Sequence, residues 1–556
     1  MTDKKASVHS HSHWRNVKRK AWQRELVAKV VELVACNDHD SLALIARTSG
    51  IPPQLRRDVW PVLLKYHPMV ISPNILSNTL AWDSQKNKWH YSQEARSGEE
   101  IETSITQDLR KYFRRRSAAG TNGPSGLESS RESAEENHIV TLLKGCILEF
   151  LAKWSRLFRY ESGLAWIALA LAEWIPIDDS NRVLQGKRHE SPVDLLSEYP
   201  LPDELIQRLP SKPEFNFSQI YERIVLVILH CPDIAMAQKL AQTESPNFSA
   251  SQYYPVLSGG DLSFQSQIFF KVFSVILPEL YQPIAEEETL RPSKKANWIY
   301  WWFKCSGTRV FHKQDRARLW DSLLGWRPNP ACINFYLNYN NKVFEHLYST
   351  TASTSIDQIF FDKICKYGHD TFWFPDLDTM RLGSSRLKCD FQVFSELLRR
   401  NKYDDSDLES LPSANLGFQD DTQSQDVDIP FSLVDPHIQL VFVYIAILQQ
   451  HEFKLLEFEE AEISEFLNNV PPLSRSDDHN YRHLYAPEED QRSVSSSEAE
   501  QEEISKKPTS SSSNSHMLIE VGDDDKTSYS FDDIFNCAGD IWRKWIWREL
   551  QEYSCD

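Results

Sequence analysis

Residues 50–64 read GIPPQLRRDVWPVLL, and this stretch contains the signals that decide the fold. Gly50 and the two prolines after it predict a turn, because these residue types favour backbone conformations that regular structure avoids. A helix is expected to begin directly after the turn, with Val59, Leu63 and Leu64 on its inner face. The stretch therefore predicts the start of a helical domain near residue 50.

Helical spacing recurs through most of the chain. Five stretches place apolar residues three or four positions apart: Trp22, Leu26, Val30, Leu33 and Val34; Leu164, Ile167, Ala168 and Leu171; Ile220, Ile224, Val227 and Ile228; Ile268, Val272, Val275 and Ile276; Ile534, Ala538, Ile541, Trp542 and Trp545. Only 17 of 556 residues are glycine, which disfavours turn-dense β folds and a glycine-lined nucleotide site. No stretch alternates long enough to build a sheet, so we expect an all-α protein.

Charge and hydropathy exclude several classes of protein. The formal net charge is −18, which disfavours a nucleic-acid binder, because such proteins present a basic face. The longest apolar runs, Leu164–Ala172 and Leu440–Leu448, have nine residues each, whereas a membrane-spanning helix needs about 20. The nine cysteines form no C-x-x-C pair, as expected of reduced thiols. We expect a cytoplasmic protein with no integral membrane segment.

The common motifs of nucleotide and metal chemistry are missing from the sequence. It has no G-x-x-x-x-G-K-[ST], G-x-G-x-x-G, H-E-x-x-H or G-x-S-x-G. We therefore expect no cofactor and no metal ion, and the chain is not itself a P-loop NTPase.

An ordered set of short motifs accompanies the opening stretch over about 270 residues. In chain order the set comprises Arg56 and Trp60, Ile105-Thr106-Gln107-Asp108, Tyr160 and Gly163, Leu277–Tyr281 (LPELY), and Leu319-Trp320-Asp321. Each match alone is weak, but together and in this order they resemble the TBC domain, the catalytic module of Rab-family GTPase-activating proteins. The resemblance implies an all-α TBC-type domain with polar insertions and a C-terminal helical extension, and a Rab-type small GTPase as partner.

The resemblance also locates the catalytic positions of that family in this sequence. Active members use an arginine from I-x-x-D-x-x-R and a glutamine from Y-x-Q, and both act in trans on the GTPase. The corresponding residues here are Lys111 and Ser162. An arginine finger contributes about 10³ to 10⁵ in rate, equivalent to about 4 to 7 kcal/mol. Lysine lacks the planar fork of arginine, and serine is shorter than glutamine, so little GTPase activation is expected.

Two further arginines are candidate substitutes for the missing finger. If residues 105–116 are helical, Arg114 and Arg115 lie on the same face as Lys111, one turn or about 5.4 Å along the helix. The alternative is a solvated basic cluster before a flexible insertion. The supporting residues that the resemblance implies are Arg56, Asp108, Tyr160 and Gly163; for Arg56 we favour a role in holding the fold together.

Three functions are compatible with these residues. The first is a GTPase-binding or scaffold protein whose catalytic activity is weak or absent. The second is an active GTPase activator that uses a substitute basic residue. The third is a GTPase-independent subunit of a complex with other signalling proteins. In none of them is the chain an enzyme by itself.

Composition divides the chain into segments with different expected structure. Stretches rich in Ser, Asp and Glu cannot bury enough apolar surface to fold, so we expect them to be flexible. The expected organisation is a polar basic N-terminus at 1–20, N-terminal helices at 21–49, the TBC-like domain at 50–445 with flexible insertions near 117–136 and 404–428, a helical extension at 446–473, a disordered linker at 474–516 and an amphipathic segment at 517–556.

Overall fold

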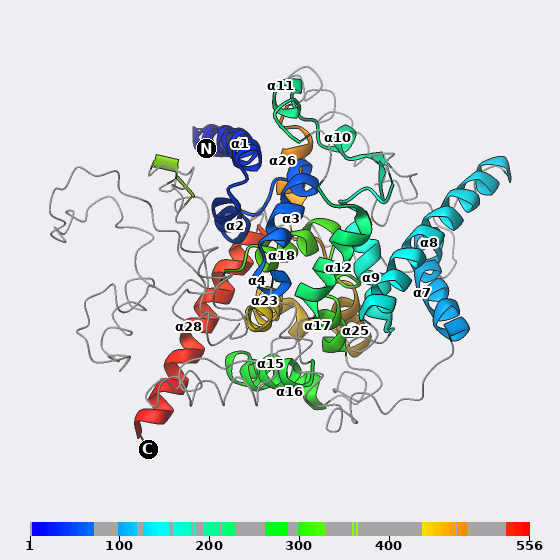
Figure 1. Ribbon diagram of the computed structural model, residues 1–556. Helices are drawn as coiled ribbons and strands as arrows, with labels where there is room; N and C mark the ends of the chain where they lie inside the picture. The colour runs from blue at the N-terminus through cyan, green and yellow to red at the C-terminus, as the bar shows by residue number, and fades with distance from the viewer. Residues whose placement is uncertain are drawn as a thin grey trace, which may run out of the picture.

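The computed structural model describes most of the regions where helical spacing is found. The described residues are 3–71, 98–118, 126–154, 160–178, 182–184, 193–210, 214–229, 262–286, 298–327, 359–360, 363–364, 436–473, 475–485 and 530–555. These residues are almost entirely helical (Figure 1). Their strands are limited to the two-residue pair β1 (Arg182–Val183) and β2 (Val193–Asp194), which is antiparallel. The all-α fold class is thus confirmed.

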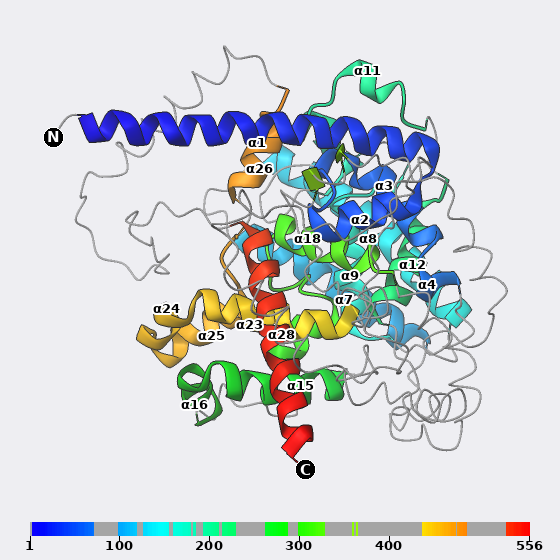
Figure 2. The ribbon, with the colours of Figure 1, turned by 90° about the vertical axis from the view of Figure 1, so that its left-hand side faces the viewer.

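The chain begins with a long helix that lies across one side of the molecule (Figure 2). The elements of this part are α1 (Asp3–Cys36), α2 (His39–Thr48), the 3₁₀ turn η1 (Pro53–Leu55), α3 (Arg56–Lys65) and α4 (Pro68–Ile71). The predicted stripe of α1 is buried from Trp22 to Val34. Asp38 caps α2 by accepting a hydrogen bond from the backbone N–H of Ser41, which satisfies one of the free donors of its first turn.

The middle of the chain forms a helical group that includes the helix with Lys111. It comprises α7 (Gly98–Ala118), α8 (Gly126–Trp154), α9 (Ser162–Ala172), α10 (Leu195–Glu198), α11 (Asp203–Ile206) and α12 (Phe217–Ile228). Helices α7, α8 and α9 pack against one another, and α12 packs on α8 and α9. Helix α9 is apolar on all sides, and its residues from Gly163 to Ala172 are all buried, as such a helix requires.

The remaining helices complete the body and return the C-terminal segment to it. They are α15 (Leu262–Ile276), α16 (Pro278–Glu286), α17 (Trp298–Lys304), α18 (Lys313–Leu324), α23 (Pro436–Gln450), α24 (Glu452–Glu457), α25 (Glu460–Asn468), α26 (Arg475–Arg482) and α28 (Phe531–Cys555). Helix α28 packs along α23, and its predicted apolar face, from Ile534 to Trp545, is buried there. Figure 2 shows α28 crossing α23, with the chain end extending beyond the body.

A buried aspartate ties the opening motif to α18. Asp321, which is inaccessible to solvent, accepts hydrogen bonds from the Trp60 indole (2.7 Å), the Arg56 guanidinium (3.0 and 3.2 Å) and the backbone N–H of Ile51 (3.1 Å). These four residues are called the Asp321 cluster below. The motif residues Arg56, Trp60 and Asp321 therefore hold η1 and α3 against α18.

The backbone conformation and the close packing at position 50 require glycine. Its φ of +71° lies in the left-handed region, and a Cβ there would lie 2.7 Å from Cδ of Arg318. The Arg318 guanidinium donates to the carbonyls of Ala46, Arg47 and Thr48 at the end of α2, so it has no room to move away. The predicted turn is present, and glycine is the residue type that permits it.

The structure corrects three of the predicted segment boundaries. Helix α8 begins at Gly126, so the second half of the predicted insertion at 117–136 is helical. Glutamate and arginine favour helix, and a helix extends readily once one of its turns has packed. Helix α23 runs through the boundary between 445 and 446, because its buried residues are continuous from Pro436 to Leu448. The insertion at 404–428 lies outside the described residues.

The third correction concerns the linker at 474–516. Its first residues form α26, which is followed by Leu484, a side chain with no solvent exposure. Arg24 of α1 donates two hydrogen bonds to the Leu484 carbonyl, at 3.0 and 3.1 Å. Arg482 forms an ion pair with Glu198 at 2.5 Å. Composition predicted disorder because the linker is rich in serine and acidic residues. Its first part nevertheless packs on the core through Tyr481, Leu484 and Tyr485.

Candidate functional site

The helix α7 presents Lys111 at the surface. Ile105, Leu109 and Phe113 occupy successive turns of one face and are buried, which fixes the rotation of α7 about its axis. The side chain of Lys111 is 60% exposed, whereas that of Asp108 is only 13% exposed. Lys111 is thus accessible at the surface, whereas Asp108 belongs partly to the core.

Asp108 joins the two motif segments that the sequence placed at the catalytic positions. Its Oδ1 accepts a hydrogen bond from Lys111 Nζ at 2.8 Å, and its Oδ2 accepts one from the Tyr160 hydroxyl at 2.9 Å. These three residues are called the Asp108 cluster below. Tyr160 lies two residues before the start of α9, so the structure brings the helix with Lys111 and the segment with Ser162 together.

Ser162 and Gly163 are the first residues of α9. Ser162 is half-buried, and Glu161, the N-cap residue before it, makes no capping hydrogen bond with its side chain. The Glu161 carboxylate instead forms an ion pair with Lys304 Nζ at 2.5 Å. A Cβ on Gly163 would lie 3.2 Å from Cγ of Lys304, so glycine allows the end of α17 to approach α9 closely.

Two residues that sequence reasoning missed, Glu161 and Lys304, therefore border the candidate site. Their pairing joins positions 143 residues apart in the chain, and no local pattern identifies it. The motif Y-x-S-G indicated this segment, but it assigned no role to Glu161, the residue at its second position.

A buried polar group anchors α7 beneath the site. The Tyr112 hydroxyl donates to the Glu173 carboxylate at 3.0 Å, and Arg316 of α18 forms an ion pair with the same carboxylate. Glu173 has no solvent exposure, and burial lowers the pKa of the Arg316 guanidinium to about 10. Tyr112, the residue after Lys111, is thus linked through Glu173 to Arg316 of α18, which restrains the position of α7.

The two candidate substitutes lie on the same helix. Helix α7 continues to Ala118, so the condition for placing Arg114 and Arg115 on the face of Lys111 is met by the backbone. Their side chains lie outside the described residues. Arg56 does not lie at this site: it is 4% exposed and belongs to the Asp321 cluster.

Comparison with known proteins identifies close relatives along the whole chain. "Oxidant-induced cell-cycle arrest protein 5" of Lachancea thermotolerans is 66% identical over 563 residues, which cover 99% of both chains. The proteins of the same name from Eremothecium gossypii and Saccharomyces cerevisiae are 51% and 44% identical, and the alignments cover 96% and 100% of this chain and 97% and 100% of theirs. This chain belongs to the oxidant-induced cell-cycle arrest protein 5 family.

No model of a protein family matches the chain, and no solved structure matches it. The name of the oxidant-induced cell-cycle arrest protein 5 family describes a response and specifies no chemistry. Among the described residues, none of the helices combines the length and hydropathy that a membrane crossing requires.

The family name directs attention to the thiols. Burial raises the pKa of the Cys146, Cys305 and Cys537 thiols above their ordinary value. A raised pKa decreases the thiolate fraction, and the thiolate is the form that oxidants attack. Burial therefore makes these three thiols less accessible to oxidants than the exposed Cys36.

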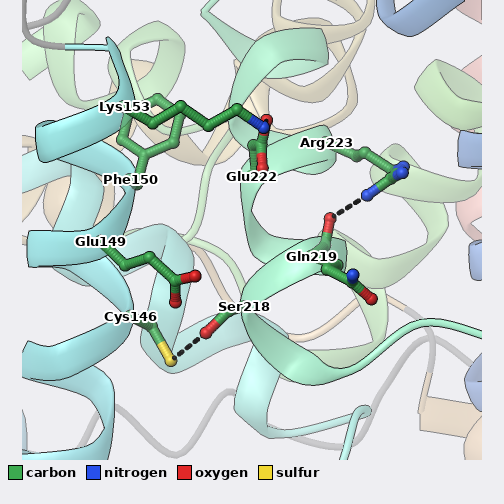
Figure 3. Close-up of a pocket in the computed structure, with 8 residues that line it drawn as sticks. All are labelled: Cys146, Glu149, Phe150, Lys153, Ser218, Gln219, Glu222 and Arg223. Atoms are coloured by element: carbon green, nitrogen blue, oxygen red, sulfur yellow. Dashed lines mark hydrogen bonds and ion pairs between the residues drawn. The ribbon is translucent and has the colours of Figure 1, made fainter.

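Cys146 lines a cavity between α8 and α12 (Figure 3). The cavity has a volume of about 230 Å³ and is lined mainly by charged and polar side chains. The Ser218 hydroxyl donates to the Cys146 sulfur at 3.1 Å, and Lys153 pairs with Glu222 at 2.6 Å. The cavity contains none of the motif residues, so we favour the α7–α9 surface as the functional site.

Proposed function

We propose that this protein is a TBC-type binding partner of a small GTPase with weak or no GTPase-activating activity, acting as a scaffold in the cytoplasmic response that the family name describes. The observation that supports the proposal is the Asp108 cluster. Two motifs separated by about 50 residues in sequence meet at one carboxylate, which is the arrangement expected if both once faced the same nucleotide.

The weak activity follows from the two side chains present. Lys111 supplies a charge but one donor group in place of the bidentate fork of arginine. The hydroxyl of Ser162 sits on a short side chain at the start of α9, so it does not reach as far from the helix as the amide of a glutamine. GTPase binding does not require either group to be catalytic, because a few anchor residues elsewhere in an interface can supply most of its binding energy.

Single-turnover GTP hydrolysis by a panel of Rab-type GTPases, with the purified chain in excess, tests the proposal. The double variant Lys111→Arg, Ser162→Gln restores both family residues, and it should accelerate hydrolysis by one GTPase by about 100-fold or more. The wild-type chain should bind that GTPase without such acceleration. Lys454→Arg on α24 is the matched control, because it makes the same exchange outside the site.

Each other outcome identifies an alternative function. If the wild-type chain accelerates hydrolysis by about 100-fold, the protein is an active GTPase activator, and Arg114→Ala and Arg115→Ala should reduce the rate. If neither the wild-type chain nor the double variant binds or activates any GTPase of the panel, the proposal fails. A GTPase-independent role within a signalling complex then becomes the better explanation, and partners should copurify regardless of nucleotide.

A further inference from the structure

The end of α17 forms a cation–aromatic cluster next to the candidate site. Trp301 is half-buried, with the Arg309 guanidinium 4.1 Å from its ring centroid and Lys304 Nζ 5.6 Å from it. Both distances are within the range of an attractive cation–π contact. Tryptophan and arginine are the residue types that most often dominate the binding energy of protein interfaces.

The cluster is continuous with the start of α9. Lys304 pairs with Glu161 at 2.5 Å, and its stem packs on Gly163, the residue after Ser162. The side chain of Lys304 is 22% exposed, whereas that of Glu161 is 62% exposed. Packing therefore holds the lysine in place, and the glutamate is the partner that can leave.

The pairing indicates the chemistry of the group that the cluster binds. A carboxylate already pairs with Lys304 in the free chain, and releasing it costs little, because a partly exposed ion pair contributes little to stability. A carboxylate from a partner would replace it inside an interface, where water is excluded and the attraction is stronger. The chain as a whole has a net charge of −18, so a local cationic cluster orients an acidic partner that the rest of the surface repels.

We propose that Trp301, Lys304 and Arg309 anchor a carboxylate on the surface of the partner GTPase, and that Glu161 occupies this anchor until the partner displaces it. The inference rests on the proposed function and specifies which part of the surface beside Ser162 supplies affinity. It assigns Glu161 the role of an internal competitor, so substitutions on the two sides of one ion pair have opposite effects.

The test measures the affinity of the purified full chain for the GTPase that wild-type protein captures from the panel, loaded with a non-hydrolysable GTP analogue. Lys304→Gln and Arg309→Gln should each weaken binding by about tenfold, the effect of losing a moderate interface anchor. Glu161→Gln should strengthen binding a few-fold. All three effects should diminish at high salt, because they are electrostatic.

Lys454→Gln is the matched control. Lys454 Nζ lies 5.4 Å from the ring centroid of Phe458, so this variant removes the same kind of cation–aromatic contact away from the site and should leave affinity unchanged. Thermal unfolding of every variant separates lost binding from lost folding. If Arg309→Gln unfolds, Arg309→Lys keeps the charge and should retain more than half of the wild-type affinity.

The outcomes separate this inference from the proposed function. If the wild-type chain binds a GTPase and folded Lys304→Gln and Arg309→Gln bind it equally well, the anchor is wrong and the proposed function stands. If Glu161→Gln weakens binding, the glutamate is a contact and the competitor role is wrong. If the wild-type chain binds no GTPase of the panel, the proposed function fails and the anchor fails with it.

Discussion

Two aspartates of this protein have similar partners but opposite surroundings. Asp321 and Asp108 each accept hydrogen bonds from one aromatic side chain and one cation. In the Asp321 cluster the side chain of the cation, Arg56, is 5% exposed, whereas in the Asp108 cluster the side chain of the cation, Lys111, is 60% exposed. Both aspartates belong to the same set of sequence motifs, so the motif alone does not separate residues that hold the fold from residues at the surface. Burial makes that distinction.

The largest effect is expected at the Asp321 cluster. Asp321→Asn leaves the Arg56 guanidinium buried without its counter-charge, which should lower the free energy of unfolding by about 3–5 kcal/mol. Chemical denaturation measures the loss. The control Asp203→Asn alters an exposed aspartate of α11 and should change stability by less than about 1 kcal/mol. Equal small effects of both variants would show that the Asp321 cluster does not hold α3 to α18.

Asp58, on the same helix as Arg56, has a side chain that is only 11% exposed and lacks such donors. Its Oδ2 has no hydrogen-bond partner among the described residues, and Arg57 is 3.7 Å from its Oδ1. Desolvation by burial raises the pKa of Asp58 to about 6. The folded state therefore binds a proton more tightly than the unfolded state, and this group makes the protein less stable as pH rises from about 4 to 6.

Asp58→Asn should remove that pH dependence. The variant should match the wild-type chain below pH 4 and exceed its unfolding free energy by about 2–3 kcal/mol at pH 7, the equivalent of a two-unit difference in pKa. Denaturation curves at pH 4, 5, 6 and 7 measure the difference between the two proteins. A difference that stays constant over this range would mean that Asp58 titrates normally in the folded chain.

A smaller effect is expected at the Asp108 cluster. Asp108→Ala should cost about 1–2 kcal/mol, chiefly because the part-buried Tyr160 hydroxyl loses its acceptor. In a double-mutant cycle with Tyr160→Phe, the stability losses of the two single variants should not add, because each variant removes the same hydrogen bond. Strictly additive losses would indicate that the two side chains stabilise the protein independently.

The smallest effect on stability is expected for Lys111→Ala. Because the lysine is well exposed, its ion pair with Asp108 should contribute no more than about 1 kcal/mol. The variant should nevertheless weaken binding to the proposed partner GTPase. Asp321→Asn, in contrast, should alter that affinity only because it unfolds the chain. If the folded Lys111→Ala variant binds the GTPase as tightly as the wild-type chain does, Lys111 does not belong to the binding surface.

Helical spacing predicted much of the fold, and it failed where a segment depends on its neighbours. The stripes of α1, α9, α12 and α28 are buried as expected, since each contains enough apolar residues to require cover. Helix α26 was missed because its stability comes from the Leu484 and Arg482 contacts with α1 and α10. At the candidate site, the motif located Lys111 and Ser162, but Lys304 comes from a helix with no motif that points to it.

The sequence by itself determined the all-α class, the turn at Gly50 and the presence of Lys111 and Ser162 within the motifs, because these depend on residue types and on spacing within one segment. Only the tertiary structure decided which charged residues are buried and which are exposed. That outcome depends on contacts between residues far apart in the chain, such as Arg56 with Asp321 and Glu161 with Lys304. The same residue types become supports of the fold where water is excluded and candidate contacts for a partner where it is not.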